Sequence, residues 1–265
     1  MSIDILRKNK FLPEVKVIAF DMDGILSNPE FRSWLETTGS LAKHYGLGEK
    51  SDSYIQKHKD FFGDYLKNST AQNYTLMEKK LVNMWREIKT VGENGDKGKL
   101  LNITKKELKE IIVEMVKVEF QEAEILIELI KKRGLVTALI SGSYDLFIET
   151  VASYIGVEHV GSNSQLQFET NKDGEEILTG FSFIFDQEGL KVTQLKELTC
   201  YLKVDKNQIV YVDDELGIRI NNAGFIVITR EDADKNLKAI AAATISDVYE
   251  DISSLLDILT PVKQN

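Results

Sequence analysis

The stretch Val15-Lys-Val-Ile-Ala-Phe-Asp-Met-Asp-Gly-Ile-Leu26 decides how the rest of the chain is interpreted. Its apolar residues form a nearly continuous run, which is typical of a parallel strand buried on both faces. The run ends in two carboxylates, Asp21 and Asp23, and then in Gly24, which lets the chain turn sharply. Because side chains alternate along a strand, Asp21 and Asp23 are expected to point the same way, with Met22 pointing away.

Two carboxylates at the end of one strand predict a cation site. In an open α/β sheet, ligands bind beyond the carboxyl ends of the strands, which is where Asp21 and Asp23 would lie. At a separation of about 4 Å, two half-buried carboxylates repel each other by several kcal/mol. A divalent cation with oxygen ligands is the simplest group that offsets this repulsion.

The composition is that of a globular protein with a sizeable core. The 265 residues are 43% hydrophobic and 28% charged, which suits one or two domains and excludes a disordered chain. The formal charge of −9 argues against nucleic acid or an anionic membrane as the main partner. A single cysteine, Cys200, no signal-peptide pattern and no membrane-span pattern favour a cytoplasmic protein.

Strands and helices alternate along most of the chain. Helices are predicted at 119–133, 144–154, 190–203 and 247–259, and further strands at 135–140, 158–161, 165–170, 176–185, 208–212 and 225–229. The turn Asn171-Lys-Asp-Gly174 predicts a hairpin between two of these strands. The alternation predicts an α/β fold with a doubly wound, mainly parallel Rossmann-like sheet.

A long segment without a convincing strand interrupts this alternation. Residues at helical spacing predict an amphipathic helix over 75–90, namely Met77, Leu81, Met84, Trp85 and Ile88. Thr104-Lys-Lys-Glu107 is a capping box that predicts the start of another helix. We therefore predict an α/β core domain of residues 1–27 and 119–265, with an inserted helical cap domain of residues 28–118.

Three predicted strands end in reactive or ligating side chains: Asp21 with Asp23, Ser141, and Asp213 with Asp214. Lys191 lies in the first turn of a predicted helix, where a cation opposes the helix macrodipole at a cost of a few tenths of a kcal/mol. A lysine directed at phosphate and carboxylate would offset that cost.

In chain order, Asp21-Met-Asp-Gly, Ser141-Gly, Lys191-Val-Thr-Gln-Leu and Val212-Asp-Asp resemble the four motifs of the haloacid dehalogenase (HAD) superfamily of phosphohydrolases. The cap, Ile140-Ser-Gly-Ser and the hairpin ending Leu178-Thr-Gly180 are most similar to the phosphoserine phosphatase branch. The resemblance covers roughly residues 15–230. The chain departs from the usual pattern at three points: Ile25 stands for a threonine, Ser143 stands for a second glycine, and Asp213-Asp214 lacks the further Gly-x-x-x-Asp.

The resemblance implies a role for each matching residue. Asp21 would be the nucleophile that forms an aspartyl-phosphate, and Asp23 would protonate the leaving oxygen and later deprotonate water. Ser141 and the backbone N–H of Gly142 would hold phosphate oxygens. Lys191 would neutralise charge on Asp21 and on the phosphoryl group.

The resemblance also implies Mg²⁺ as the cofactor. Asp21, Asp213 and the main-chain carbonyl of Asp23 would be its ligands. Three roles stay open for Asp214, which could ligate the metal, orient a metal-bound water or cap a helix.

The expected activity is Mg²⁺-dependent hydrolysis of a phosphate ester of a small polar metabolite, with a phosphoserine-like substrate favoured. Glu30 stands where phosphoserine phosphatases carry a glutamate that binds the substrate's ammonium group, and Arg86 could bind a carboxylate. A solvated loop glutamate and a helix-surface arginine explain these two residues equally well. Phosphocholine, phosphoethanolamine, nucleotide and sugar phosphates stay open as substrates.

Two other classes of function use similar sets of residues. A phosphotransferase or phosphomutase would use the same residues while excluding water from the aspartyl-phosphate. A phosphorylated receiver-type switch also combines an Asp pair, an acceptor Asp, Ser or Thr, and Lys. The order of the acidic motifs and the helical insertion count against a receiver.

Overall fold

The computed structural model describes residues 14–68, 71–94, 100–183, 190–214 and 217–259. These residues form a seven-stranded sheet with the strand order β4-β3-β2-β1-β5-β6-β7. The strands are β1 (Val17–Phe20), β2 (Val136–Tyr144), β3 (His159–Thr170), β4 (Glu176–Phe183), β5 (Ile209–Val212), β6 (Ile226–Arg230) and β7 (Ala243–Ile245). All pairs are parallel except β3 with β4, so the predicted, mainly parallel sheet is confirmed.

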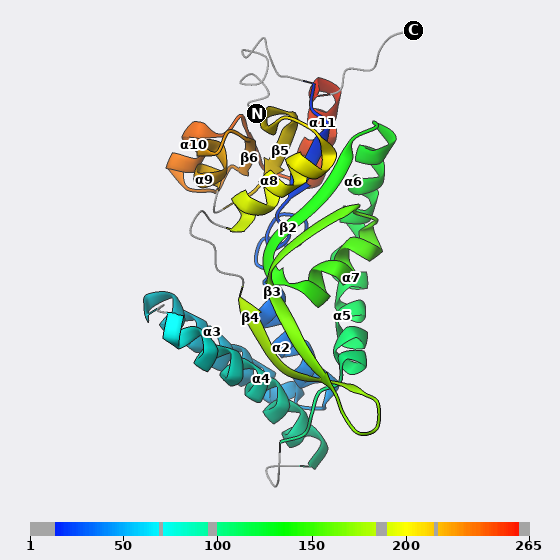
Figure 1. The fold of residues 1–265 in the computed structure, drawn as a ribbon, viewed down its shortest axis with the longest axis vertical. Coiled ribbons are helices and arrows are strands. Elements are labelled where there is room, and N and C mark those ends of the chain that lie inside the picture. Colours follow the sequence, from blue (N-terminus) through cyan, green and yellow to red (C-terminus); the bar gives the residue numbers. More distant parts are fainter. Residues whose placement is uncertain (1–13, 69–70, 95–99, 184–189, 215–216, 260–265) are drawn as a thin grey trace.

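Helices cover both faces of the sheet (Figure 1). One face packs against α6 (Gln121–Lys132), α7 (Asp145–Ile155) and α11 (Val248–Leu259), and β1 contributes Ile18 and Phe20 to it. The other face packs against α8 (Leu190–Leu202), α9 (Gly217–Asn222) and α10 (Lys235–Ile240), and β1 contributes Val17 and Ala19. The continuous apolar run of β1 is therefore explained by burial on both sides, and the doubly wound architecture is confirmed.

A block of helices extends from one end of the sheet, at the bottom of Figure 1. It comprises α2 (Ser33–His44), the 3₁₀ helix η1 (Gly48–Lys50), α3 (Ser51–Asn68), α4 (Ala71–Asn94) and α5 (Lys105–Glu119). The helix predicted at 75–90 is part of α4, in which Leu81, Trp85 and Ile88 are buried. The division into a core of 1–27 and 119–265 and a cap of 28–118 stays a prediction.

None of the helices among the described residues is both long enough and apolar enough to cross a membrane.

Two strands are longer than the sequence predicts. The predicted strands 158–161 and 165–170 are parts of one strand, β3, and β2 continues through Ser141–Tyr144, beyond the predicted end at residue 140. The reason is pairing with β3, because Ser141 and Tyr144 align with Ser162 and Ser164. From Ser141 to Tyr144 β2 advances by three residues while β3 advances by two, so β2 has one extra residue there and forms a bulge.

Other boundaries differ in smaller ways. Residues 184 and 185, the predicted end of the strand 176–185, lie outside the described residues. The elements β7, α9 and α10 have no counterpart among the predicted ones, because three to six residues are too few to show a period.

The start of α5 is fixed by the predicted capping box. The Thr104 hydroxyl accepts a hydrogen bond from Glu107 N–H at 3.2 Å, and the Glu107 carboxylate accepts one from Thr104 N–H at 2.8 Å. The residue before the cap pairs with the hairpin, since Leu178 N–H of β4 donates to Ile103 O at 2.9 Å. The capping box of Thr104 and Glu107 therefore also determines where α5 meets the hairpin of β3 and β4.

Thr104→Ala is expected to lower the free energy of unfolding by about 1 kcal/mol, because it leaves the Glu107 N–H without its acceptor. Urea unfolding followed by circular dichroism measures the change. Thr104→Ser is the matched control and should unfold like the wild type, since it keeps the hydroxyl. Equal destabilisation by both substitutions would show that the cap is not the source of the effect.

A polar cluster lies inside the helical block. His58 of α3 is fully buried, and its Nδ1 lies 2.7 Å from the Thr38 hydroxyl of α2. The same hydroxyl accepts a hydrogen bond from Trp85 Nε1–H of α4 at 2.9 Å, so one oxygen joins three helices. Burial lowers the pKa of His58 to about 4.

The pKa of His58 predicts how stability depends on pH. An unfolded histidine binds a proton below pH ~6.5, whereas folded His58 binds one only near pH 4. Between these values the unfolded chain holds more protons, so the free energy of unfolding falls as pH falls, by roughly 3 kcal/mol in total. Urea titrations at several pH values measure this slope.

His58→Gln should flatten the pH dependence of stability between pH 6.5 and 4. His44→Gln, at an exposed histidine of α2, should leave the dependence unchanged. A slope that persists in His58→Gln would contradict the assignment.

Candidate active site

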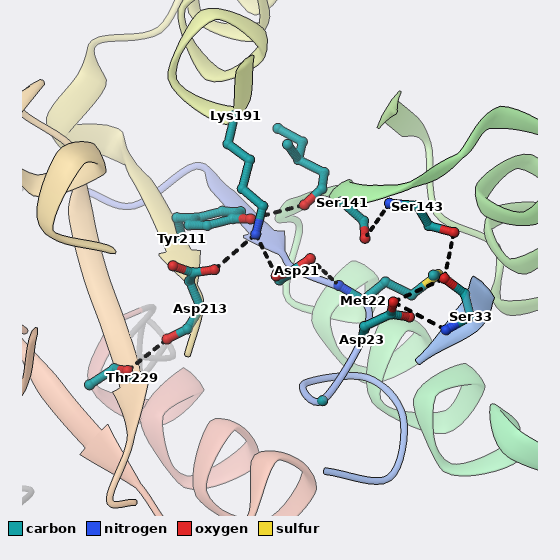
Figure 2. Close-up of polar contacts among 12 residues, drawn as sticks. Asp21, Met22, Asp23, Ser33, Ser141, Ser143, Lys191, Tyr211, Asp213 and Thr229 are labelled. Atoms are coloured by element: carbon teal, nitrogen blue, oxygen red, sulfur yellow. Dashed lines mark hydrogen bonds and ion pairs between the residues drawn. The ribbon is translucent and has the colours of Figure 1, made fainter. Parts of the chain in front are cut away.

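Asp21 and Asp213 lie side by side because their strands are neighbours. Phe20 at the end of β1 pairs with Val212 at the end of β5, and each strand is followed at once by its aspartate. Lys191, in the first turn of α8, reaches both carboxylates (Figure 2). Its Nζ forms an ion pair with Asp21 Oδ2 and another, of 3.0 Å, with Asp213 Oδ1.

This triad of Asp21, Lys191 and Asp213 is buried, with Lys191 only 9% exposed. Burial by itself lowers the pKa of Lys191. The negative charges of Asp21, and to a smaller extent Asp213, raise the pKa and outweigh the effect of burial. The pKa of Lys191 is therefore held well above its usual range and the side chain stays charged. Because removal of one partner would leave an uncompensated buried charge, the three side chains depend on one another.

Asp23 has a different environment from Asp21. Its Oδ2 accepts two hydrogen bonds from Ser33, the first residue of α2, one from the N–H at 3.2 Å and one from the hydroxyl at 2.9 Å. Its Oδ1 is buried and has no hydrogen-bond partner among the described residues. Burial, and next the charge of Asp21, raise the pKa of Asp23 to about 7. A carboxyl group with such a pKa is present in both protonation states near neutral pH, as acid–base catalysis needs.

Ser141 and Gly142 belong to β2, on the other side of β1 from β5. Ser141 is buried, and its hydroxyl oxygen accepts a hydrogen bond from Ser143 N–H at 3.3 Å. Gly142 is exposed, and the nearest atom to a Cβ at this position would be Asn163 Nδ2 at 3.6 Å. The structure therefore brings Asp21, Asp213 and Ser141 to the same edge of three adjacent strands.

The carboxylates of Asp21, Asp213 and Asp214 fit a magnesium ion. One oxygen of each lies within 4.8 Å of the others, and these are the hard oxygen donors that Mg²⁺ prefers. Gly24 makes room for this arrangement, because a Cβ there would stand 3.0 Å from Asp214 Oδ2. Gly24 also has φ = +80°, a conformation that favours glycine.

Further hydrogen bonds hold the triad in place, and two of them come from buried residues outside the sequence motifs, Thr229 and Tyr211. Thr229 of β6 donates its hydroxyl hydrogen to Asp213 O at 2.7 Å, and Tyr211 of β5 donates to Ile140 O at 2.9 Å. Gln194 of α8 donates to Ser162 O of β3 at 2.7 Å, which ties the helix of Lys191 to the strand beside Ser141. The available sequence signal for Tyr211 and Thr229 is a hydroxyl group inside an otherwise apolar strand.

The two predicted substrate contacts, Glu30 and Arg86, have other neighbours. Glu30 is exposed and borders a surface cavity of about 750 Å³ between the loop of residues 28–32 and helices α2, α3 and α5. Arg86 of α4 donates from Nη2 to Leu178 O of β4 at 2.9 Å. Neither side chain contacts the acidic cluster among the described hydrogen bonds and ion pairs.

No family model and no curated protein sequence matches the chain. Solved structures with a similar fold do match the chain. A phospho-aspartyl intermediate analogue of phosphoserine phosphatase is 20% identical, with a TM-score of 0.58 over 91% of this chain and 99% of that one. A substrate-bound phosphoserine phosphatase complex gives the same four values. A HAD family hydrolase from Salmonella enterica serovar Typhi is 16% identical, with a TM-score of 0.60 over 96% of this chain and 73% of that one.

The chain therefore has the HAD fold, as the motifs predict. The similarity in fold to phosphoserine phosphatases extends over nearly the whole of those chains.

Mg²⁺ is expected to raise the unfolding temperature, because an ion that binds only the folded state stabilises it by about 2.7 kcal/mol at 100 times its Kd. Asp213→Asn should abolish this rise, since it removes a buried ligand charge. Differential scanning calorimetry with and without Mg²⁺ measures the shift. Asp173→Asn, in the exposed hairpin turn, is the matched control and should respond like the wild type. If Mg²⁺ raised the unfolding temperature of Asp213→Asn as much as that of the wild type, the ion would have to bind at another site.

Proposed function

We propose that this chain is a Mg²⁺-dependent phosphomonoester hydrolase that acts through an aspartyl-phosphate on Asp21. The observation that carries the proposal is the buried triad of Asp21, Lys191 and Asp213, with Asp23 two residues beyond the first aspartate. One similar structure is a phospho-aspartyl intermediate analogue of phosphoserine phosphatase, which supports covalent chemistry on an aspartate.

In the first step a carboxylate oxygen of Asp21 attacks phosphorus. The bond from phosphorus to the ester oxygen breaks, and this oxygen takes a proton from Asp23 and leaves as an alcohol. Lys191 remains beside Asp21 and balances the charge that gathers on the phosphoryl oxygens. Ser141 and the N–H of Gly142 bind those oxygens from the neighbouring strand.

In the second step water attacks the phosphorus of the aspartyl-phosphate. Asp23, now a carboxylate, takes the proton of the water, the bond between Asp21 and phosphorus breaks, and inorganic phosphate leaves. Asp23 is then protonated and Asp21 free, as at the start. A single side chain thus serves both half-reactions.

Asp21, Asp213, Asp214 and the main-chain carbonyl of Asp23 would hold the magnesium ion. When bound, the ion would neutralise the charge of the transferring phosphoryl group and fix its orientation. The rest of catalysis is positioning by the chain's own residues.

The favoured substrate is a small polar phosphate ester of the phosphoserine type. The likeness to a substrate-bound phosphoserine phosphatase supports this choice at the level of the fold. The proposed roles of Glu30 for an ammonium group and Arg86 for a carboxylate rest on the sequence. Arg86 would have to exchange its hydrogen bond to Leu178 O for one to the substrate.

The test is phosphate release from a panel of phosphomonoesters that includes phosphoserine, phosphocholine, phosphoethanolamine, nucleotide and sugar phosphates. Wild type with Mg²⁺ is expected to release phosphate, and EDTA should stop the release. Asp21→Asn should have no measurable turnover, because the amide is not a nucleophile. Asp173→Asn makes the same chemical change at an exposed position and should keep full activity.

No release from any ester by folded wild type that binds Mg²⁺ would overturn the proposal. Transfer of the phosphoryl group to an added alcohol, without free phosphate, would identify a phosphotransferase instead.

A further inference from the structure

Two pairs of hydroxyl groups join α2 to β2 beside the acidic cluster. The Ser33 hydroxyl lies 2.6 Å from that of Ser143, and the Thr37 hydroxyl lies 2.6 Å from that of Tyr144. All four residues are buried, with Thr37 one turn after Ser33 on the same face of α2. The bulge in β2 lets the consecutive residues Ser143 and Tyr144 both turn inward.

The direction of the hydrogen bonds in the first pair follows from Asp23. The Ser33 hydroxyl donates its single hydrogen to Asp23 Oδ2, which can accept it both when Asp23 is ionised and when Asp23 carries its proton on Oδ1. Ser33 must then accept from Ser143, whose own N–H donates to the hydroxyl oxygen of Ser141. Figure 2 shows this chain, which runs from Ser141 through Ser143 and Ser33 to Asp23.

The chain leaves the two oxygens of Asp23 unequal. Oδ2 accepts both the hydroxyl and the N–H of Ser33, whereas Oδ1 is buried and has no hydrogen-bond partner among the described residues. A buried polar atom without a partner is costly, and at a reacting centre it is explained by a group that binds there. Ile25, two residues beyond Asp23, is buried and offers no hydroxyl, so Ser33 supplies the only side-chain bond that the described residues give to Asp23.

Building on the proposed function, we infer that Ser33 and Ser143 are positioning residues which hold Asp23 so that Oδ1 carries the transferred proton. Ser143 holds Ser33, and Ser33 holds Oδ2, so the carboxyl group cannot rotate. Oδ1 then faces the leaving oxygen in the first step and the attacking water in the second. The serine at position 143, where the resembling family commonly has glycine, is explained as the partner of Ser33.

The experiment compares two esters of similar shape, p-nitrophenyl phosphate and phenyl phosphate. Phenol has a pKa of about 10, like tyrosine, and its oxygen needs a proton as it leaves, whereas p-nitrophenolate leaves without one. The quantity measured is kcat/KM, which covers only the steps up to the aspartyl-phosphate. Later hydrolysis, in which Asp23 acts as a base, therefore does not enter.

Ser33→Ala is expected to lower kcat/KM for phenyl phosphate by about 100-fold, because a small misplacement of a reacting group costs that much. It should change kcat/KM for p-nitrophenyl phosphate little. Ser143→Ala should act in the same direction with a smaller effect. Ser33→Thr keeps the hydroxyl and should restore the hydrolysis of phenyl phosphate.

Tyr144→Phe is the matched control. It breaks the other hydroxyl pair between α2 and β2 without touching Asp23, so the ratio of the two kcat/KM values should stay that of the wild type. Thermal unfolding of every variant shows that the fold is kept.

An unchanged ratio in folded Ser33→Ala, or an equal change in Tyr144→Phe, would overturn the inference while the hydrolase assignment stands. A wild type that hydrolyses no phosphomonoester would overturn the assignment, and the inference with it.

Discussion

The ammonium group of Lys191 between the carboxylates of Asp21 and Asp213 is the interaction on which the rest of the structure depends. Three buried charges meet at one point, and each comes from a different element: β1, α8 and β5. If one were displaced, the others would be buried without compensation, at a cost of several kcal/mol. The strand order must therefore place β5 beside β1, and α8 must start at the carboxyl edge of the sheet.

Two aspartates only two residues apart acquire opposite chemical characters from their surroundings. Asp21 lies against a cation, while Asp23 accepts a hydrogen bond from the Ser33 hydroxyl and has its pKa raised to about 7 by burial. Pairs of carboxyl groups whose environments differ in this way divide the work of nucleophile and acid. Both aspartates follow β1, and their contacts with α8 and α2 give them different environments.

The sequence reveals those features that local physics fixes. The continuous apolar runs of β1 and β5 predict strands buried on both faces. Because the carboxyl ends of parallel strands meet at one side of the sheet, the aspartates that follow these strands are expected to lie close together. The capping box at Thr104 is also confirmed. It could be predicted because its two partners, Thr104 and Glu107, are only three residues apart.

Features that depend on contacts between distant parts of the chain could not be predicted from local sequence patterns. Ser33 and Ser143 are 110 positions apart, so no local pattern pairs them. The polar run Ser162-Asn-Ser-Gln165 hides the continuity of β3, because partners on both sides keep it extended despite its weak strand propensity. The roles of Glu30 and Arg86 depend on a substrate, and the chain alone does not determine which one.

The hairpin of β3 and β4 has a consequence for how the protein could be rebuilt. Its far half packs against the helices. The Leu178 N–H donates to Ile103 O, Arg86 Nη2 donates to Leu178 O, and the ring centroids of Phe181 and Trp34 lie 5.3 Å apart. The helical block is therefore not an interchangeable module. Grafting a different block onto this sheet, to accept a larger substrate for example, would require replacing the hairpin along with it. The helical block and the hairpin would have to be exchanged together, although residues 120–158 separate them in the chain.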